Sequence, residues 1–179
     1  MFIVFLFAMD IARNGGFSGD DRRLRRMPDT PAPTLTATFV MTPGVTAKDY
    51  LEEGRTHFNQ GDFEAALHSY ERAVLADPQN ATTYFWRGRA YFELNDPTRA
   101  MLDFDTALTL DAEYADALGY RCSALSWLGR YEEAIPDCSQ AVELEPDEEW
   151  YWYLRGNAYS QLDQYQDALS DYSKALRFV

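Results

Sequence analysis

The sequence predicts an all-α protein: a right-handed superhelical solenoid of four helix–turn–helix units that follows a disordered amino-terminal tail. A pattern of 34 residues recurs four times between residues 47 and 179 with no insertion or deletion. Hydrophobic residues make up 46% and charged residues 25% of the chain, which is typical of a soluble globular protein. The apolar run at residues 1–9 is less than half as long as a membrane-spanning helix. These observations favour repeated helix pairs over a membrane protein or a disordered chain.

The charge divides the chain into two parts. Sixteen Lys and Arg residues against 29 Asp and Glu residues give a formal net charge of −13. Residues 47–179 hold 11 basic and 25 acidic residues, whereas residues 1–46 hold five and four. Such an acidic surface repels phosphate backbones, so nucleic acid is not expected as the main partner.

Residues 1–46 are predicted to be a disordered or apolar and basic leader. An apolar start precedes a basic cluster at residues 22–26 and a stretch rich in Pro and Thr. Two alternatives stay open: residues 1–9 act as a secretory signal or membrane anchor, or translation begins at Met41. A signal would need a preceding positive charge and a small-residue cleavage pattern, which the sequence lacks. The expected location is therefore cytoplasmic, or membrane-associated or exported if residues 1–9 act as a signal.

The four units span residues 47–80, 81–114, 115–148 and 149–179. Equivalent positions of the four units hold side chains of similar size. Position 20 is alanine throughout, and so is position 27: Ala66, Ala100, Ala134, Ala168 and Ala73, Ala107, Ala141, Ala175. Position 8 holds Gly54, Gly88, Cys122 and Gly156, and position 24 holds Tyr70, Phe104, Cys138 and Tyr172. Small residues let two helices approach closely while large ones fill the space between them.

Helix boundaries fall where this pattern requires them. Residues 46–49 can form a capping box at the start of the first helix. Asp96 can cap a helix that starts at Pro97, and Gly61 and Gly129 suit the left-handed turn inside their units. Proline at position 32 of the first and third units closes the second helix there. Eight antiparallel helices without strands are expected, stabilised by stacking.

The pattern resembles the tetratricopeptide repeat (TPR) family, whose signature is a large residue, Leu-Gly and Tyr, then Ala, Phe, Ala and Pro. The resemblance covers residues 47–179, about three quarters of the chain. Position 7 departs from the usual Leu, and the third repeat is the least typical because it has cysteine at positions 8 and 24. The resemblance implies a domain that binds an extended peptide or helix of a partner on the concave face of the first helices.

An ion pair is predicted between positions 7 and 23. Repeats 2–4 carry arginine at the first and aspartate at the second: Arg87, Arg121, Arg155 and Asp103, Asp137, Asp171. Repeat 1 changes both places together, to Glu53 and Ser69. We expect pairing either within a unit or across the junction between neighbouring units; the alternative is separate solvated charges.

The concave face is predicted to be aromatic and neutral. Of the 24 residues at the usual contact positions, eight are aromatic, and their charges sum to zero. The groove residues are expected to be Arg55, Phe85, Trp86, Arg89, Tyr120, Trp127, Trp150, Tyr153 and Asn157. Trp, Tyr and Arg dominate binding hot spots, so this composition favours a non-catalytic protein-interaction scaffold. For Phe85, packing against the next repeat is an equal alternative.

No catalytic, metal or cofactor site is expected. His57 occupies a packing position, and His68 is predicted at the surface. Cys122 and Cys138 occupy packing positions, where cysteine behaves as a small hydrophobe, and no histidine of their repeat could activate them. No glycine-rich phosphate loop precedes a strand–helix unit.

One well-known activity of this family is not expected here. Co-chaperone arrays of this family clamp the acidic carboxyl terminus of heat-shock chaperones with Lys, Asn, Asn, Lys and Arg. The corresponding places hold Leu51, Arg55, Trp86, Asp116 and Tyr120, so that activity is not expected. The eighth helix lacks a polar cap, which leaves two alternatives: a homodimer through its exposed face, or a regulatory fragment of a longer enzyme.

Overall fold

The computed structural model describes residues 44–177, which form eight α-helices. The helices are α1 (Ala47–Asn59), α2 (Phe63–Ala76), α3 (Ala81–Glu93), α4 (Pro97–Leu110), α5 (Ala115–Trp127), α6 (Tyr131–Leu144), α7 (Glu149–Gln161) and α8 (Tyr165–Ala175). The described residues contain no strand. The predicted leader lies almost wholly outside the described residues, and so do both alternatives for it. No helix in residues 44–177 has the length and apolarity needed to cross a membrane.

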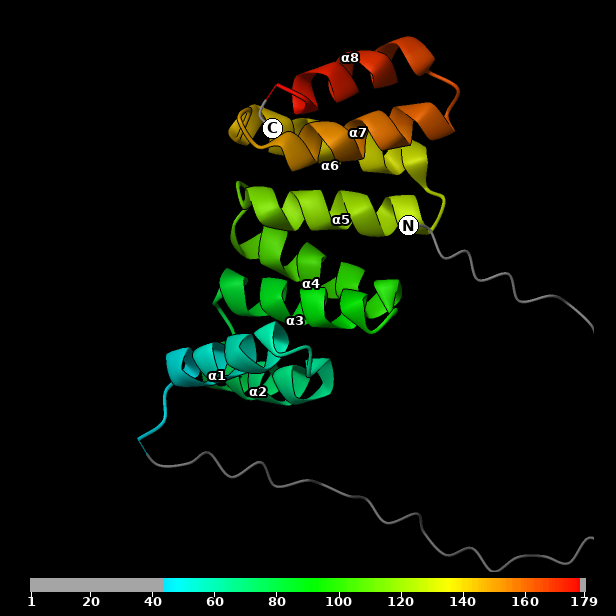
Figure 1. The fold of residues 1–179 in the computed structure, drawn as a ribbon. Coiled ribbons are helices and arrows are strands. Elements are labelled where there is room, and N and C mark those ends of the chain that lie inside the picture. The colour runs from blue at the N-terminus through cyan, green and yellow to red at the C-terminus, as the bar shows by residue number, and fades with distance from the viewer. Residues whose placement is uncertain (1–43, 178–179) are drawn as a thin grey trace, which may run out of the picture. The chain divides into compact units, whose positions relative to one another are not determined.

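The helices stack in chain order as four pairs. Each odd-numbered helix packs on the even-numbered helix that follows it, and that helix packs on the next pair (Figure 1). The odd-numbered helices also contact one another in succession, α1 with α3, α3 with α5 and α5 with α7. The predicted all-α solenoid of four helix pairs is confirmed. One row of first helices therefore forms a continuous face across the array.

The turns inside the units share one backbone conformation. At position 15, Gly61 and Gly129 adopt left-handed φ angles of 79° and 74°. The same position in the other two units holds Asn95 and Asp163, with φ angles of 61° and 60°. Asparagine and aspartate tolerate this region better than other residues with a side chain. The sequence indicated the two glycines but not their equivalents.

The predicted caps are formed. The Thr46 hydroxyl accepts a hydrogen bond from the backbone N–H of Asp49, and the Asp49 carboxylate accepts one from the backbone N–H of Thr46. The hydrogen bonds that the Thr46 hydroxyl and the Thr46 backbone N–H donate to the Asp49 carboxylate lower the pKa of that carboxyl. At α4, Asp96 accepts from the backbone N–H of Arg99 at 3.0 Å, and Pro97 is the first helical residue. Both helices thus begin where their sequence signals predicted.

Glycine at position 8 makes room for an aromatic ring at position 24. A Cβ atom added to Gly88 would lie 2.7 Å from Cε1 of Phe104. Gly54 faces Tyr70 in the same way, and Gly156 faces Tyr172. The ring fills the space that the missing side chain leaves, so the two positions act as one packing pair.

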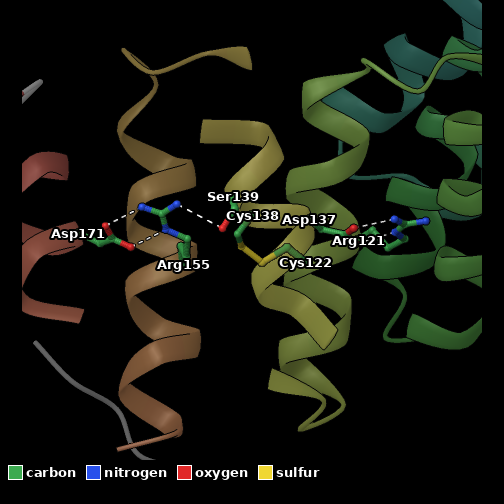
Figure 2. Close-up of a disulfide and its surroundings, with 7 residues drawn as sticks. All are labelled: Arg121, Cys122, Asp137, Cys138, Ser139, Arg155 and Asp171. Carbon is green, nitrogen blue, oxygen red and sulfur yellow. Dashed lines mark hydrogen bonds and ion pairs between the residues drawn. A yellow bond between two sulfur atoms is a disulfide. The ribbon is translucent and has the colours of Figure 1, made fainter. Parts of the chain in front are cut away.

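The third unit replaces this packing pair by a disulfide between Cys122 and Cys138. The two Cα atoms are 5.6 Å apart, and both residues are completely buried between α5 and α6 (Figure 2). The expectation that the two cysteines are separate small hydrophobes is therefore wrong. Their positions are packing positions, as expected, but they face each other closely enough to be joined.

Position 7 and position 23 pair within each of repeats 2–4. The guanidinium groups of Arg87, Arg121 and Arg155 each donate two hydrogen bonds of 2.6–2.9 Å to the buried carboxylates of Asp103, Asp137 and Asp171. The predicted ion pairs are confirmed, and the bidentate geometry is the strongest form for such a pair. These bonds raise the pKa of all three arginines.

Two of these arginines also cross the junction to the preceding unit. Arg121 donates to the Asp105 carboxylate at 2.7 Å, and Arg155 donates to the Ser139 hydroxyl at 3.3 Å (Figure 2 shows the second bond). Repeat 1, which lacks the motif, pairs Glu53 with Arg72 at 3.7 Å instead. The pair between positions 7 and 23 therefore forms within a unit, and the contacts across the junction use position 25 of the preceding unit instead.

Candidate functional site

The face formed by α1, α3, α5 and α7, which we call the inner face, carries a row of aromatic side chains. Phe58 on α1 meets Trp86 on α3 edge to face, with ring centroids 5.5 Å apart. Tyr120 on α5 contacts Trp150 on α7 at 4.8 Å. All four residues are half-buried, so each ring packs against its neighbours while part of it stays exposed. Rings held in this way form a pre-organised apolar surface.

Arg89 joins the two ring pairs of this row. Its guanidinium carbon lies 4.6 Å from the ring centroid of Trp86, 4.7 Å from that of Tyr120 and 4.8 Å from that of Phe58. These rings come from three successive first helices, so one cation bridges three units. Arginine stacked on aromatic faces gains cation–π energy, of about 0.5–2 kcal/mol per ring.

Arg55 contacts the same tryptophan from the α1 side. Its guanidinium carbon is 5.0 Å from the ring centroid of Trp86, and it forms an ion pair with Glu52 at 3.3 Å. Both partners of that pair are exposed. Arg55 therefore carries its own counter-charge, in contrast to Arg89.

The positive charge of Arg89 affects the tyrosines around it. Burial raises the pKa of Tyr120, and the nearby guanidinium of Arg89 opposes this rise. The same two influences act on Tyr70, whose ring lies beside Trp86. Both phenols therefore stay protonated at neutral pH, and the inner face carries no phenolate.

A hollow of about 260 Å³ continues the inner face between α5 and α7. Its lining is Ser123, Ser126, Trp127, Tyr131, Leu154, Asn157 and Gln161. Trp127 is 57% exposed there, and Asn157 accepts a hydrogen bond from the Tyr172 hydroxyl at 3.1 Å. Tyr131 was not predicted at this face, because it comes from the second helix of its unit and position 17 is not a usual contact position.

Phe85 does not belong to the exposed part of the inner face. Only 2% of it is exposed, and its ring packs 4.9 Å from that of Tyr114, the last residue of its own unit, and 5.6 Å from that of Tyr120 in the next unit. Its prediction as a groove residue is corrected: position 5 of this repeat faces the core. Tyr153 is 50% exposed and lies beside Tyr172, toward a second hollow at α8.

The remaining chemistry-bearing residues stand apart from one another. His57 is half-buried and His68 is exposed on α2. In residues 44–177, no group of three or more His, Cys, Asp and Glu side chains is placed to hold a metal ion. The arrangement on the inner face suits contact with an apolar or mixed polypeptide surface.

Known families and structures resemble the whole array. Tetratricopeptide repeat profiles match residues 51–117, and then residues 115–148 and 150–178. MamA, whose crystal structure is known, is 23% identical to this chain in sequence, and the two structures match with a TM-score of 0.69. The match covers 74% of this chain and 77% of the MamA chain. MamA residues 41 to the end, from Desulfovibrio magneticus RS-1, gives 24% identity, a TM-score of 0.70 and coverages of 76% and 77%.

The first TPR domain of Spaghetti (RPAP3), bound to the HSP90 peptide SRMEEVD, is also similar. It is 30% identical with a TM-score of 0.59, and the match covers 70% of this chain and 94% of that domain. Among curated proteins, no relative matches the sequence.

Proposed function

Because the chain belongs to the tetratricopeptide repeat family, we propose that it is a non-catalytic scaffold whose inner face holds a peptide or helix of a partner protein. The single observation that carries this proposal is the half-buried row Phe58, Trp86, Tyr120 and Trp150, two ring pairs from four first helices that Arg89 joins. Rigid aromatic anchors that are partly exposed in a folded domain are typical of binding hot spots. Arg89, which bridges the row, adds hydrogen-bond donors at its centre.

The chemistry of the partner differs from that of the HSP90 peptide bound by the RPAP3 domain. The places of the carboxylate clamp here hold an apolar residue, two aromatic residues, one arginine and one aspartate: Leu51, Trp86, Tyr120, Arg55 and Asp116. The Asp116 carboxylate would repel a terminal carboxylate. The aromatic row instead favours apolar side chains of the partner, which gain about 25 cal/mol for each Å² of apolar surface removed from water.

The test uses the full chain as bait in the cell that makes it, together with two variants. The double substitution Trp86→Ala and Tyr120→Ala is expected to weaken partner binding by about 2 kcal/mol or more, as for hot-spot residues. Trp152→Ala is the matched control, since the Trp152 indole N–H donates to the Pro146 carbonyl, away from the aromatic row. Circular dichroism verifies that each variant folds. Equal capture by the wild type and the double variant would refute the proposal.

A second candidate function is self-association through α8. Leu169 and Leu176 are 67% and 74% exposed there, beside an apolar hollow of about 390 Å³ that includes Trp150 and Tyr153. A second copy of the chain would cover this apolar surface. Sedimentation velocity over a range of concentrations tests the idea: a dimer that Leu176→Asp abolishes supports it, and a monomer at every concentration refutes it.

The Cys122–Cys138 disulfide bears on the compartment. Disulfides persist in oxidising compartments and are rare in the cytoplasm, so this bond favours export over a cytoplasmic location. Cells are quenched in acid and the protein is then alkylated in denaturant without reductant, because both cysteines are buried in the folded chain. Two unmodified cysteines support an oxidising compartment, and complete alkylation supports the cytoplasm.

A further inference from the structure

Among the residues that the structure describes, Arg89 has no carboxylate partner. In residues 44–177 no hydrogen bond or ion pair of its guanidinium is present, and its Nε atom is buried without a hydrogen-bond acceptor. The other inner-face arginine, Arg55, pairs with Glu52. A buried donor that belongs to a charged group and has no acceptor costs folding free energy, so this unmet group requires an explanation.

The aromatic surroundings of Arg89 do not meet this need. The rings of Phe58, Trp86 and Tyr120 contact the guanidinium through their π-electrons but offer no hydrogen-bond acceptor in their faces. They do exclude water from part of the cation and hold it in place. An ion pair formed in such a partly dry site is stronger than one in open solvent.

A second polar group near Trp86 also has no hydrogen-bond partner among the described residues. The Tyr70 hydroxyl is likewise buried without a hydrogen-bond partner, and its ring lies 6.5 Å from that of Trp86. Around one tryptophan the structure thus places an unpaired cation and an unpaired hydroxyl. Neither has an acceptor among the described residues, but only the partly exposed Arg89 can be reached by an anion, since Tyr70 is completely buried.

We propose that Arg89 receives the carboxylate of a single Asp or Glu side chain of the bound partner, flanked by apolar residues that pack on Trp86 and Tyr120. This proposal rests on the proposed function, because it names the chemistry of the segment held by the inner face. Charge complementarity carries it, since the unpaired cation lies in the middle of an apolar row.

The rest of the array sets a limit on the partner's charge. Glu52, Glu93 and Asp116 are exposed on the same first helices, and Glu93 and Asp116 act electrostatically on Tyr120. They would repel additional acidic residues to either side of Arg89. A single carboxylate between apolar residues is favoured, and a run of acidic residues is not.

The experiment selects binders from a library of random peptides displayed with both ends blocked, using the full chain as the target. Selected peptides are expected to share one acidic position beside apolar anchors. Replacement of that residue by its amide should weaken binding to the wild type by about tenfold or more, as for hydrogen bonds to charged groups. The same replacement should change binding to the Arg89→Gln variant less than about twofold.

Arg55→Gln is the matched control, because it removes a cation that contacts the same indole but has its own partner. This variant should keep the acidic preference, and Arg89→Lys should keep part of it. Thermal unfolding of each variant verifies that the fold is intact. Selected peptides that bind through Trp86 and Tyr120 but show no acidic position would overturn this inference and leave the proposed function standing. If no selected peptide depends on Trp86 and Tyr120, both fail.

Discussion

Reduction of the Cys122–Cys138 disulfide should destabilise the array by an amount that follows from the loop it closes. The bond joins residues 16 apart in sequence. In the chain-entropy account, a loop of about this length lowers the entropy of the unfolded chain enough to contribute about 3 kcal/mol at 25 °C. Because small domains have only about 5–15 kcal/mol of stability, this is a large share.

The assay is urea unfolding followed by circular dichroism, with and without a phosphine reductant. Both cysteines are completely buried, so the protein is reduced in urea and then refolded under reducing conditions. The reduced protein should unfold at lower urea, with a free energy of unfolding about 3 kcal/mol smaller. A larger dependence on urea is also expected, because the reduced unfolded chain exposes more surface.

The repeats supply a matched control. The double substitution Cys122→Gly and Cys138→Phe gives the third unit the packing pair that Gly88 and Phe104 form in the second. This variant should fold, and the reductant should leave its stability unchanged. Two free thiols in the denatured, unreduced wild type would refute the reasoning, and so would a loss of less than about 1 kcal/mol on reduction.

Three other measurements test the packing, the ion pairs and the buried phenols. Gly88→Ala should lower the free energy of unfolding by about 1–3 kcal/mol, because its Cβ would lie 2.7 Å from Phe104; a gain, as expected from helix propensity alone, would contradict this. Asp137→Ala should cost about 1–3 kcal/mol, because Arg121 loses its bidentate partner and keeps only Asp105, and a double-mutant cycle on Arg121 and Asp137 showing no coupling would count against the pair. Burial raises the pKa of Tyr114 to about 12, above its value in the unfolded chain, so the folded state favours the protonated phenol. Its contribution to stability should be complete below about pH 10 and fall as the pH rises toward 12, which phenolate absorbance and circular dichroism can follow together.

The helices and their pairing were predictable because the sequence states each requirement four times. Position 7 and position 23 change together in repeat 1, which indicated that Arg121 and Asp137 are partners before their geometry was known. Asn95 and Asp163 escaped notice because their left-handed backbone is only favoured, not required, by those side chains. In contrast, a glycine at the same place indicates the turn directly.

The disulfide and the limits of the inner face were harder to predict. The pattern holds a usable signal for the disulfide, since positions 8 and 24 are small and large in the other units and must therefore touch. Phe85 illustrates a different difficulty: position 5 lies at the border between the inner face and the core. Its burial depends in part on Tyr120, which belongs to the next unit and contacts Phe85 only because the two units pack together.

The disulfide and the ion pairs that join the helices are unevenly distributed along the array, so its two ends are expected to differ in local stability. The third unit combines a covalent bond with Arg121, which binds carboxylates in two units, whereas Arg72 of the first unit pairs with Glu53 at the longer distance of 3.7 Å and donates to the neutral Tyr50 hydroxyl. In a stack where each unit touches only its neighbours, fraying starts at the weakest end. The amino-terminal pair should exchange its amide hydrogens fastest and be the first to yield under force. A partner that binds at Phe58 would then suppress local unfolding in the helix pair that unfolds most often.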